Sequence, residues 1–516
     1  MSPSDFLTIL GLALAVWAII PSKERRFILL FFSKYEIGLF IALLFFIHYL
    51  ISFDWIMSNW FPCFSLFTCE KGIPSTIWAY IISLTVIIYP VVKVSYCYFS
   101  SSRLIDLISL YESLLKENEI DLLVNYINKY HVEDIKKYLQ RLSHLPQKET
   151  IDIVLNRETN KDVEYKNLVR SDRMRFARLV YEHIFQDESF VHNAANKYPE
   201  LFAIAFSGME TEESSNEKLV KLYVKCLFEE KNQSLIKELR IMNNVGDSVL
   251  GMSKINNVPI LFSLFAHTNA AAKNYVWYPV GEGTIRSLKY DSDQKDFLMK
   301  RFDSDLETEL WNQKIYIAIV YFNYMVRETI YRYSDWHMWL FYFKDFTNLM
   351  IEIIPNKNSY EEQASDYDTF AHNIIEKLLS IINDWLELSI EQEKENQVFD
   401  ITRCLGSCIY SICRAGSLKI SDNFKQKQVE SILTMYFKLS KYHNNNTAKT
   451  IRERLEKLFL NPEWIDIEKP STSKEYLAVL KDAWKGFDKF NYQVNGGNGS
   501  TEQFETNVLI PLGIIT

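Results

Sequence analysis

Glycine and proline are scarce in this chain, which has 15 Gly and 13 Pro among its 516 residues. Average proteins contain about 7% glycine and about 5% proline, so both residues fall well below their usual share. Because glycine and proline interrupt helices and dominate turns, their scarcity favours long helices and argues against a turn-rich β-sandwich. Hydrophobic residues make up 48% of the chain, which excludes a mostly disordered protein.

The chain also lacks the short motifs that identify common enzyme classes. It has no phosphate-binding loop of the G-x-x-x-x-G-K-[ST] type, no H-E-x-x-H pair and no G-x-S-x-G elbow. Gly281-Glu282-Gly283 lacks the third glycine of a dinucleotide-binding turn and follows no clear strand. We therefore expect no cofactor and no catalytic residues, and we interpret the chain as a non-enzyme. A membrane-tethered enzyme of an unrecognised type stays an alternative.

Two arginine–histidine pairs have the R-x4-H spacing that helical RNases of the HEPN type use: Arg178 with His183, and Arg332 with His337. In such enzymes the histidine acts as an acid or base and the arginine stabilises phosphate charge. Two matches are close to the number that chance places in a chain of this length. We therefore expect no RNase activity.

Seven cysteines are present, and their spacing predicts no metal site. Cys404, Cys408 and Cys413 belong to one expected helix, but no histidine lies nearby to complete a zinc site, so we interpret them as small buried residues. Cys63 and Cys69 share one loop between apolar runs. They are candidates for a disulfide if that loop faces an oxidising exterior, a pairing that also depends on geometry.

Three apolar runs occupy residues 6–20, 37–53 and 77–92. A helix needs about 17–25 residues to cross a hydrocarbon core of about 30 Å, so each run is at the short end. Tryptophan and tyrosine, which favour the membrane interface, flank the second and third runs. The first run is not typical of a cleaved signal peptide, because no basic segment precedes it and no small-residue cleavage site follows it. We predict about three transmembrane helices within a membrane domain at residues 1–103.

The orientation follows from the basic side chains beside these runs. Four of them lie in the loop between the first two runs: Lys23, Arg25, Arg26 and Lys34. The loop at residues 54–75 has only Lys71. The positive-inside rule then places residues 54–75 outside and everything after residue 92 in the cytoplasm. We predict a multi-pass membrane protein, in the inner membrane if the source is bacterial, with the bulk of the chain cytoplasmic.

His48 lies within the second run, where an ionisable side chain is a candidate for a membrane function. The simpler interpretation places His48 at the outer interface. No row of charged residues follows the three runs, so an ion-coupled transporter has little support. Residues 27–32 are apolar but too short to span, and we expect them to lie at the inner interface.

The rest of the chain is acidic. Residues 1–103 carry seven Lys and Arg against five Asp and Glu, whereas the whole chain has a net charge of −8. An acidic surface does not attract phosphate backbones, so we expect no general nucleic-acid binding. The expected partners are membrane lipid and another protein, with a homo-oligomer as a further possibility.

Apolar side chains recur every three or four residues after residue 104, which predicts one helix after another. We expect helical cytoplasmic domains at residues 104–290 and 291–492. They form an irregular α-solenoid or a helical bundle, because no repeat of fixed period is present. The stretch at residues 276–293 is expected to be irregular. Residues 146–166, which contain the only plausible strand, are expected to form a linker.

Two further apolar segments could be hidden membrane elements. Residues 315–326 are too short to span a bilayer and are typical of a buried core helix. Residues 336–354 are amphipathic, and core packing is again the simpler interpretation.

The C-terminal residues 493–516 begin with a Gly- and Asn-rich stretch, which predicts a flexible tail. The tail ends in an apolar segment that needs a docking surface. Val508, Leu509 and Ile510 are therefore candidate partner-contact residues, or they fill a groove of the same chain.

A membrane domain followed by a large helical region is an architecture shared by many bacterial effectors and sensors, including some anti-phage proteins. We therefore expect a membrane-anchored helical interaction protein that acts as a sensor or effector in anti-phage defence or a stress response. An oligomeric channel or membrane-perturbing effector is the alternative.

Overall fold

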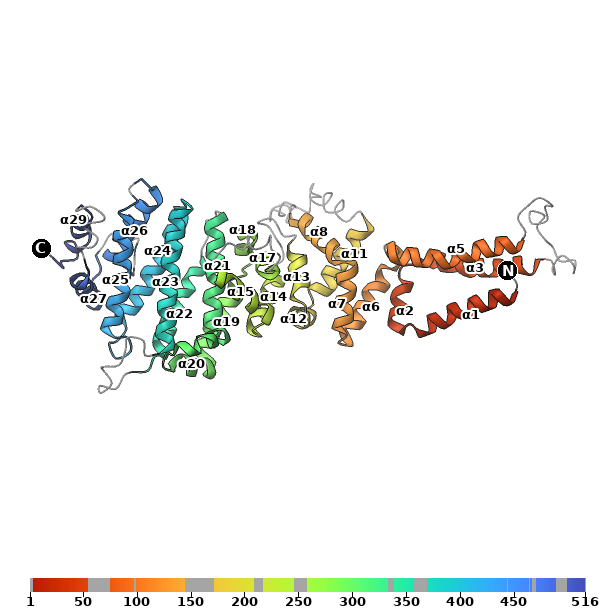
Figure 1. Cartoon of the computed structure of the whole chain (residues 1–516), viewed down its shortest axis with the longest axis horizontal. Helices are drawn as coiled ribbons and strands as arrows, with labels where there is room; N and C mark the ends of the chain where they lie inside the picture. Colours follow the sequence, from red (N-terminus) through yellow and green to blue (C-terminus); the bar gives the residue numbers. More distant parts are fainter. Residues whose placement is uncertain are drawn as a thin grey trace, which may run out of the picture. The chain divides into compact units, whose positions relative to one another are not determined.

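The computed structural model describes residues 3–53, 75–96, 99–143, 171–207, 217–245, 258–332, 338–356, 369–442, 444–463, 465, 470–488 and 499–515. These residues form helices and turns and contain no strand (Figure 1). The predicted mostly α-helical class is therefore confirmed. The expected linker at residues 146–166 lies outside the described residues, and so does the loop that contains Cys63 and Cys69.

The chain divides into two compact units. The first unit contains Met1–Tyr138 and Glu158–Phe190, and the second contains Leu139–Arg157 and Val191–Thr516. The domain boundaries expected near residues 103 and 290 stay predictions. The apolar N-terminal helices belong to the same unit as the first helices of the following region.

The first unit has both the apolar helices and a short helical bundle. The helices that begin in it are α1 (Pro3–Ile19), α2 (Ser22–Leu29), α3 (Lys34–Ile51), α5 (Ser75–Tyr96), η2 (Ser101–Arg103), α6 (Leu104–Lys116), α7 (Ile120–Tyr130), α8 (Val132–Ser143), α11 (Asp172–Val180), the π-helical turn η3 (Tyr181–Phe185) and α12 (Glu188–Lys197).

The second unit is built entirely from helices in its described part. They are α13 (Pro199–Phe206), α14 (Glu217–Glu229), α15 (Gln233–Val245), α17 (Pro259–Phe265), α18 (Thr268–Lys273), α19 (Tyr278–Tyr290), α20 (Ser292–Met299), η4 (Ser304–Asn312), α21 (Lys314–Arg332), η5 (Met338–Leu340), α22 (Phe341–Ile353), α23 (Phe370–Glu391), α24 (Asn396–Arg414), α25 (Asp422–Leu439), α26 (Asn446–Leu460), α27 (Lys474–Gly486), α29 (Gly499–Phe504) and the π-helical turn η6 (Glu505–Leu509).

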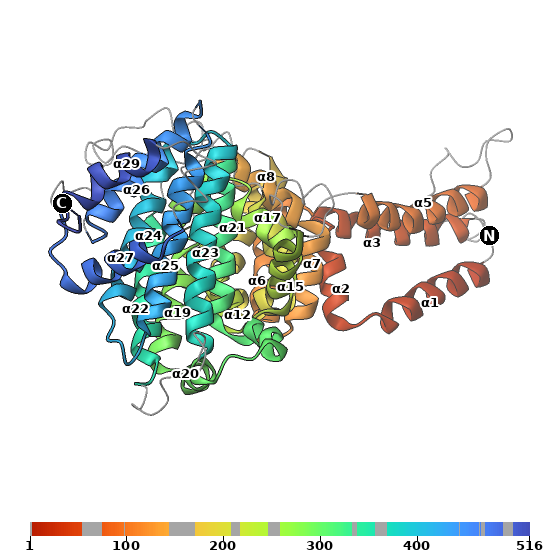
Figure 2. The same ribbon diagram turned by 60° about the vertical axis from the view of Figure 1, so that its left-hand side comes forward.

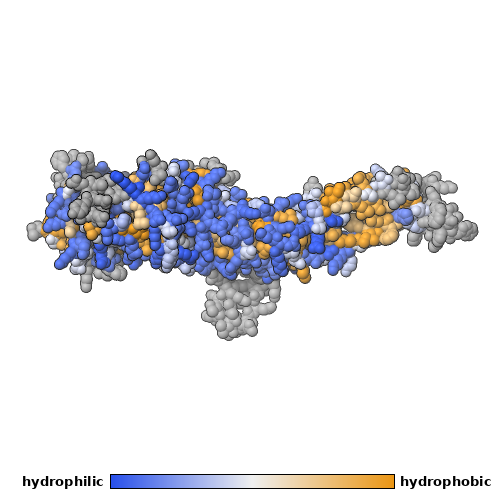
Figure 3. Space-filling view, turned by 90° about the horizontal axis from the view of Figure 1, so that it is seen from below, coloured by the Kyte–Doolittle hydropathy of each residue, from blue (hydrophilic) through white to orange (hydrophobic). Residues whose placement is uncertain are grey.

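Two helices of the first unit, α3 and α5, are long and apolar enough to cross a membrane. Only 11% of the most apolar window of each helix is buried against protein. The helix α1, with 17 residues, is apolar but shorter. It contacts α3 and α5 through Phe6, which packs with Ile47 and Leu50. The surface of these helices is largely hydrophobic, whereas the surface of the second unit is mostly hydrophilic (Figure 3).

The core of the second unit is formed by long helices that lie side by side, among them α21, α23 and α24 (Figure 2). The apolar segment at residues 315–326 forms the middle of α21 and is almost entirely buried, as expected for a core helix. The described part of the amphipathic segment at residues 336–354 contains η5 and α22, and α22 buries Tyr342, Phe343 and Phe346. Both segments therefore pack within the protein core.

The stretch at residues 276–293 is not irregular, which corrects the prediction. It contains α19 and the start of α20. A Cβ atom at Gly281 would lie only 2.3 Å from the Tyr342 ring, and one at Gly283 would lie 3.1 Å from Phe228. The two glycines therefore allow close packing of α19 against neighbouring helices.

Candidate functional site

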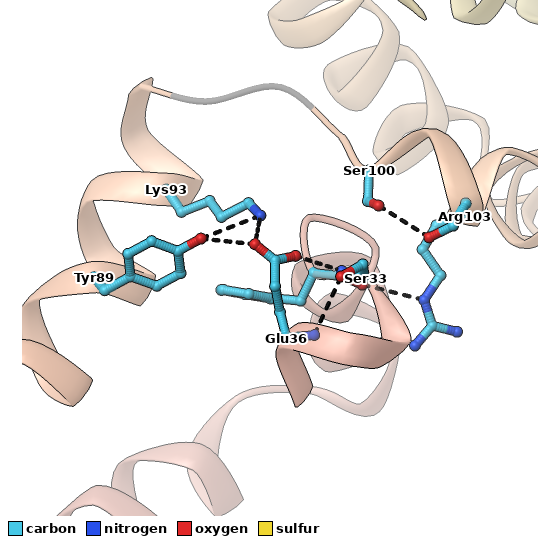
Figure 4. A network of polar contacts seen from close by, with 8 residues as sticks. Ser33, Glu36, Tyr89, Lys93, Ser100 and Arg103 are labelled. Carbon is cyan, nitrogen blue, oxygen red and sulfur yellow. Dashed lines mark hydrogen bonds and ion pairs between the residues drawn. The ribbon is translucent and has the colours of Figure 1, made fainter. Parts of the chain in front are cut away.

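A polar network joins α3 to α5 at the end of the apolar helices nearest α2 (Figure 4). The Glu36 carboxylate accepts a hydrogen bond from the Tyr89 hydroxyl at 2.6 Å and forms an ion pair with Lys93. Its second oxygen accepts from the Ser33 backbone N–H at 2.7 Å, while the Ser33 hydroxyl accepts from the Glu36 N–H at 3.2 Å. This is a capping box, so Glu36 caps the start of α3 and also holds α5 beside it.

The residues between α2 and α3 are tied to the residues that follow α5. The Ser100 backbone N–H donates to the Leu30 carbonyl at 3.3 Å. The Arg103 Nε–H donates to the Phe32 carbonyl at 3.2 Å, and the same guanidinium pairs with Asp106 at 2.9 Å. Arg103 thus links the loop before α3 to the first turn of α6.

An aromatic cluster covers these polar contacts on the side of the helical bundle. Phe27 of α2 stacks on Tyr126 of α7 with ring centroids 3.8 Å apart. Phe31 packs against Phe99 at 4.3 Å, and both rings lie near Tyr130. Phe27, Phe31 and Phe32 are buried. The aromatic side chains of the segment at residues 27–32 therefore pack against protein. Its expected position at the inner membrane interface stays a prediction.

His131 lies at the centre of this cluster and is fully buried. Its ring stacks on Phe99 at 5.4 Å, and its Nε2 atom lies 2.9 Å from the Tyr111 hydroxyl. Burial lowers the pKa of His131 to about 3, so the ring is neutral at physiological pH. The histidine therefore has a packing role at neutral pH.

Charged side chains complete the contact at its solvent edge. Lys23 of α2 pairs with both Glu117 and Glu119, which lie between α6 and α7. Hydrogen bonds to these two carboxylates raise the pKa of Lys23. We call the combined contact the junction; it consists of the Glu36 network, the Arg103 links, the aromatic cluster and these ion pairs. Its arrangement fastens the apolar helices to the bundle at several points.

The residues predicted from the sequence are spread over the chain and do not form one site. The His48 side chain is exposed on the last turns of α3. Cys63 and Cys69 lie outside the described residues. Cys404, Cys408 and Cys413 are buried and free, in agreement with the interpretation as packing residues.

The C-terminal segment differs from the flexible tail that was expected over residues 493–516. Its described part is helical from Gly499 to Leu509. Val508 and Leu509 are fully buried, whereas Ile510 is half exposed. The Glu456 carboxylate of α26 accepts hydrogen bonds from Gln503 at 3.0 Å and Asn507 at 2.8 Å. The groove for Val508 and Leu509 therefore belongs to the same chain.

The two residues of the first R-x4-H pair each contact a carboxylate of their own. Arg178 pairs with Glu182 at 2.8 Å, and His183 faces Glu112 at 3.4 Å. Arg332 pairs with the buried Glu328, and His337 lies outside the described residues. Each described member of these pairs contacts a carboxylate.

Sequence reasoning missed the junction. Ser33 and Glu36 have the capping-box spacing, which a search for helix starts would have found. Glu36 pairs with Lys93, and Phe27 stacks on Tyr126. These residues are far apart in the chain, and no local sequence pattern predicts such contacts.

Comparison of the chain with known protein families, with curated proteins and with solved structures finds no match.

Proposed function

We propose that this protein is a membrane-anchored helical interaction protein, a sensor or effector in which a bilayer segment and a helical region move as one body. The observation that carries the proposal is the junction. It fastens α2, α3 and α5 to α6 and α7 through stacked rings, ion pairs and backbone hydrogen bonds. A passive anchor needs only a flexible linker, and such a linker does not require specific contacts with the helical bundle.

The membrane part of the proposal has α3 and α5 crossing the bilayer as a hairpin, with α1 as a third, shorter apolar helix. Lipid then covers the side chains that protein leaves exposed, such as Leu39, Phe45 and Ile88. We place the junction at the cytoplasmic interface, because the basic Arg26 and Lys34 lie exposed beside it. The end of α3 and the start of α5 lie at the opposite end of the hairpin.

The remaining helices form, in this proposal, an irregular α-solenoid in the cytoplasm that receives a protein partner. Acidic, aromatic-rich helical surfaces offer contacts for an amphipathic helix. A tilt of α3 against α5 changes the Glu36 network directly. The Phe27–Tyr126 stack then transmits that change to α7, so that the bilayer and the partner surface influence each other.

Topology is tested with single cysteines placed in the full-length protein in intact cells. We expect an impermeant maleimide to label a cysteine at position 65 but not one at position 300. The reverse labelling would overturn the proposed orientation. Labelling at both positions after membrane permeabilisation is the control that each site is reactive.

Coupling is tested in the full-length protein reconstituted in lipid nanodiscs. Phe27→Ala removes the ring that stacks on Tyr126, and Leu29→Ala changes a more exposed residue of the same helix. We expect faster amide hydrogen exchange in α6 and α7 for Phe27→Ala only. Equal exchange in both variants would refute mechanical coupling. Dye leakage from vesicles that contain the wild-type protein would instead favour a channel.

A further inference from the structure

A cysteine, a histidine and a glutamate lie within contact distance of one another in the second unit. We call these three residues, Cys226, His192 and Glu230, the relay. His192 lies on α12, and Cys226 lies on α14 with Glu230 directly after it. The His192 Nδ1 atom is 3.7 Å from the Cys226 Sγ atom, and its Nε2 atom is 3.3 Å from a Glu230 carboxylate oxygen. The thiol therefore contacts the base, and the carboxylate contacts the other nitrogen of the base and orients its ring.

The relay is held in place by two asparagines. Asn196, one turn after His192 on α12, donates to the other oxygen of Glu230 at 2.6 Å. Asn232 is buried in the turn after α14 and donates to the Asn196 carbonyl at 3.0 Å, while its side-chain oxygen accepts from the Ser234 N–H at 3.0 Å. This turn is thus fixed to the end of α12, which sets the position of Glu230.

The carboxylate selects the histidine tautomer that suits proton abstraction. With the ring proton on Nε2, His192 donates to Glu230 and leaves Nδ1 free to accept the thiol proton. The His192 side chain is 60% exposed, so the base exchanges protons readily with solvent. Cys226 itself is 5% exposed, at the edge of the helix packing.

The thiol needs such a base to react at neutral pH. Burial, together with the charges of Glu230 and Glu229, raises the pKa of Cys226 to about 11, and Lys225 opposes this only in part. Thiolate is the nucleophilic form of cysteine, and it is rare at pH 7 for a thiol of this kind. Reaction then requires that the proton moves to His192 as the sulfur attacks.

We propose that Cys226 is a covalent modification site for soft carbon electrophiles of the α,β-unsaturated carbonyl class, with His192 as the base and Glu230 as the residue that positions it. In the step, the Sγ–H proton moves to His192 Nδ1 and the sulfur forms a bond to the β-carbon. The carbon–carbon π bond breaks to give an enolate, and the imidazolium returns the proton to the α-carbon. The product is a thioether, and no oxidant or leaving group is required.

The other described cysteines give an internal comparison. Cys404, Cys408 and Cys413 are buried, and the structure gives none of them a histidine partner. Burial raises the pKa of Cys413 to about 12, so it lacks both thiolate and base. Selective modification at Cys226 therefore distinguishes the relay from thiol chemistry in general.

The experiment measures alkylation of the detergent-solubilised full-length protein by N-ethylmaleimide, followed by peptide mass spectrometry. We expect Cys226 to react first among the four cysteines above. Cys226 should already react at pH 7.5, well below the pKa of about 11 of its thiol, because His192 accepts the proton. His192→Gln should slow the reaction at pH 7.5 by about tenfold or more.

Glu230→Gln should also slow the reaction, because the tautomer is then less well fixed. Glu229→Gln is the matched control: it removes the same charge one residue away, where the carboxylate pairs with Arg286 at 3.1 Å, and should change the rate by about twofold at most. Helix content of every variant, from circular dichroism, separates a chemical effect from misfolding. The proposal is overturned if Cys226 reacts no faster than Cys413, or if folded His192→Gln reacts as fast as the wild type.

Discussion

The helices α3 and α5 of the first unit and α21 and α23 of the second unit are all long and rich in apolar residues, but their surroundings are opposite. Fourteen of the 19 residues of α21 are buried by neighbouring helices, whereas only Ile47 and Leu50 of the 18 residues of α3 are. The apolar side chains of α21 are removed from water by packing against protein, which is favourable. The described residues give no such cover to most of α3. The comparison teaches that apolar composition identifies a helix that must be covered, while the fold decides whether protein covers it.

The largest expected effect is a loss of stability when a cavity is made between the buried helices α21 and α23. Trp385 of α23 is fully buried, its Nε1–H donates to Asn323 at 2.8 Å, and Phe343 packs edge-on against it. Trp385→Ala should lower the free energy of unfolding by about 3–5 kcal/mol. Denaturant unfolding of the detergent-solubilised protein measures this.

Phe45→Ala in α3 is the matched control, because Phe45 is 73% exposed. It should change the same free energy by less than about 0.5 kcal/mol. A loss as large as that of Trp385→Ala would mean that α3 is also covered by protein.

The next effect concerns insertion into a bilayer. Phe45→Asp puts a carboxylate near the middle of α3, where insertion costs about 2.5–3.5 kcal/mol more. We expect a larger fraction of this variant to be extracted from membranes by alkaline carbonate. Ser380→Asp, on the exposed side of α23, should leave extraction unchanged. Equal extraction of both variants would place α3 outside the bilayer.

A third prediction uses pH to probe the covered aromatic cluster at the junction. The pKa of His131 is about 3 in the folded protein and near 6.5 in an unfolded chain. Between these values the unfolded state binds more protons, so stability is full above pH 6.5 and falls as the pH drops toward 3. His131 should therefore destabilise the first unit by about 2 kcal/mol at pH 5 relative to pH 7.

The variant His131→Phe should lose this pH dependence, although it also removes the hydrogen bond to Tyr111. His183→Gln, which alters an exposed histidine, should keep it. Thermal unfolding of the three proteins across the pH range provides the measurement. A His131→Phe protein whose stability falls as steeply as the wild type would contradict the assignment.

The smallest expected effect is a change in stability that differs in sign between alanine substitutions at two glycines. Gly281→Ala puts a methyl group against the Tyr342 ring and should destabilise the protein by about 1–3 kcal/mol. Gly38→Ala on α3 meets no atom within 4 Å, so it should be neutral or stabilise the helix by up to about 1 kcal/mol. Melting temperatures in detergent compare the two. A destabilising Gly38→Ala would indicate close packing of α3 against another helix in the membrane.

The sequence by itself determined where the helices lie. The apolar runs at residues 37–53 and 77–92 correspond to α3 and α5, and the segment at residues 315–326 lies within α21. Such assignments succeed because the spacing of apolar residues in a helix and the capping residues at its ends are local properties of the chain.

Only the tertiary structure decided what each helix touches. The stretch at residues 276–293 is expected to be irregular from the sequence, but it is helical, and Gly281 allows close contact with Tyr342. Phe27 belongs to a short apolar run in the sequence, and only the structure shows that it stacks on Tyr126. Val508 resembles a partner contact, but it is buried in its own chain. Cys226 and His192, 34 residues apart, meet only because α12 packs beside the end of α14. Contacts between distant residues depend on packing over the whole fold, and a local pattern does not contain that information.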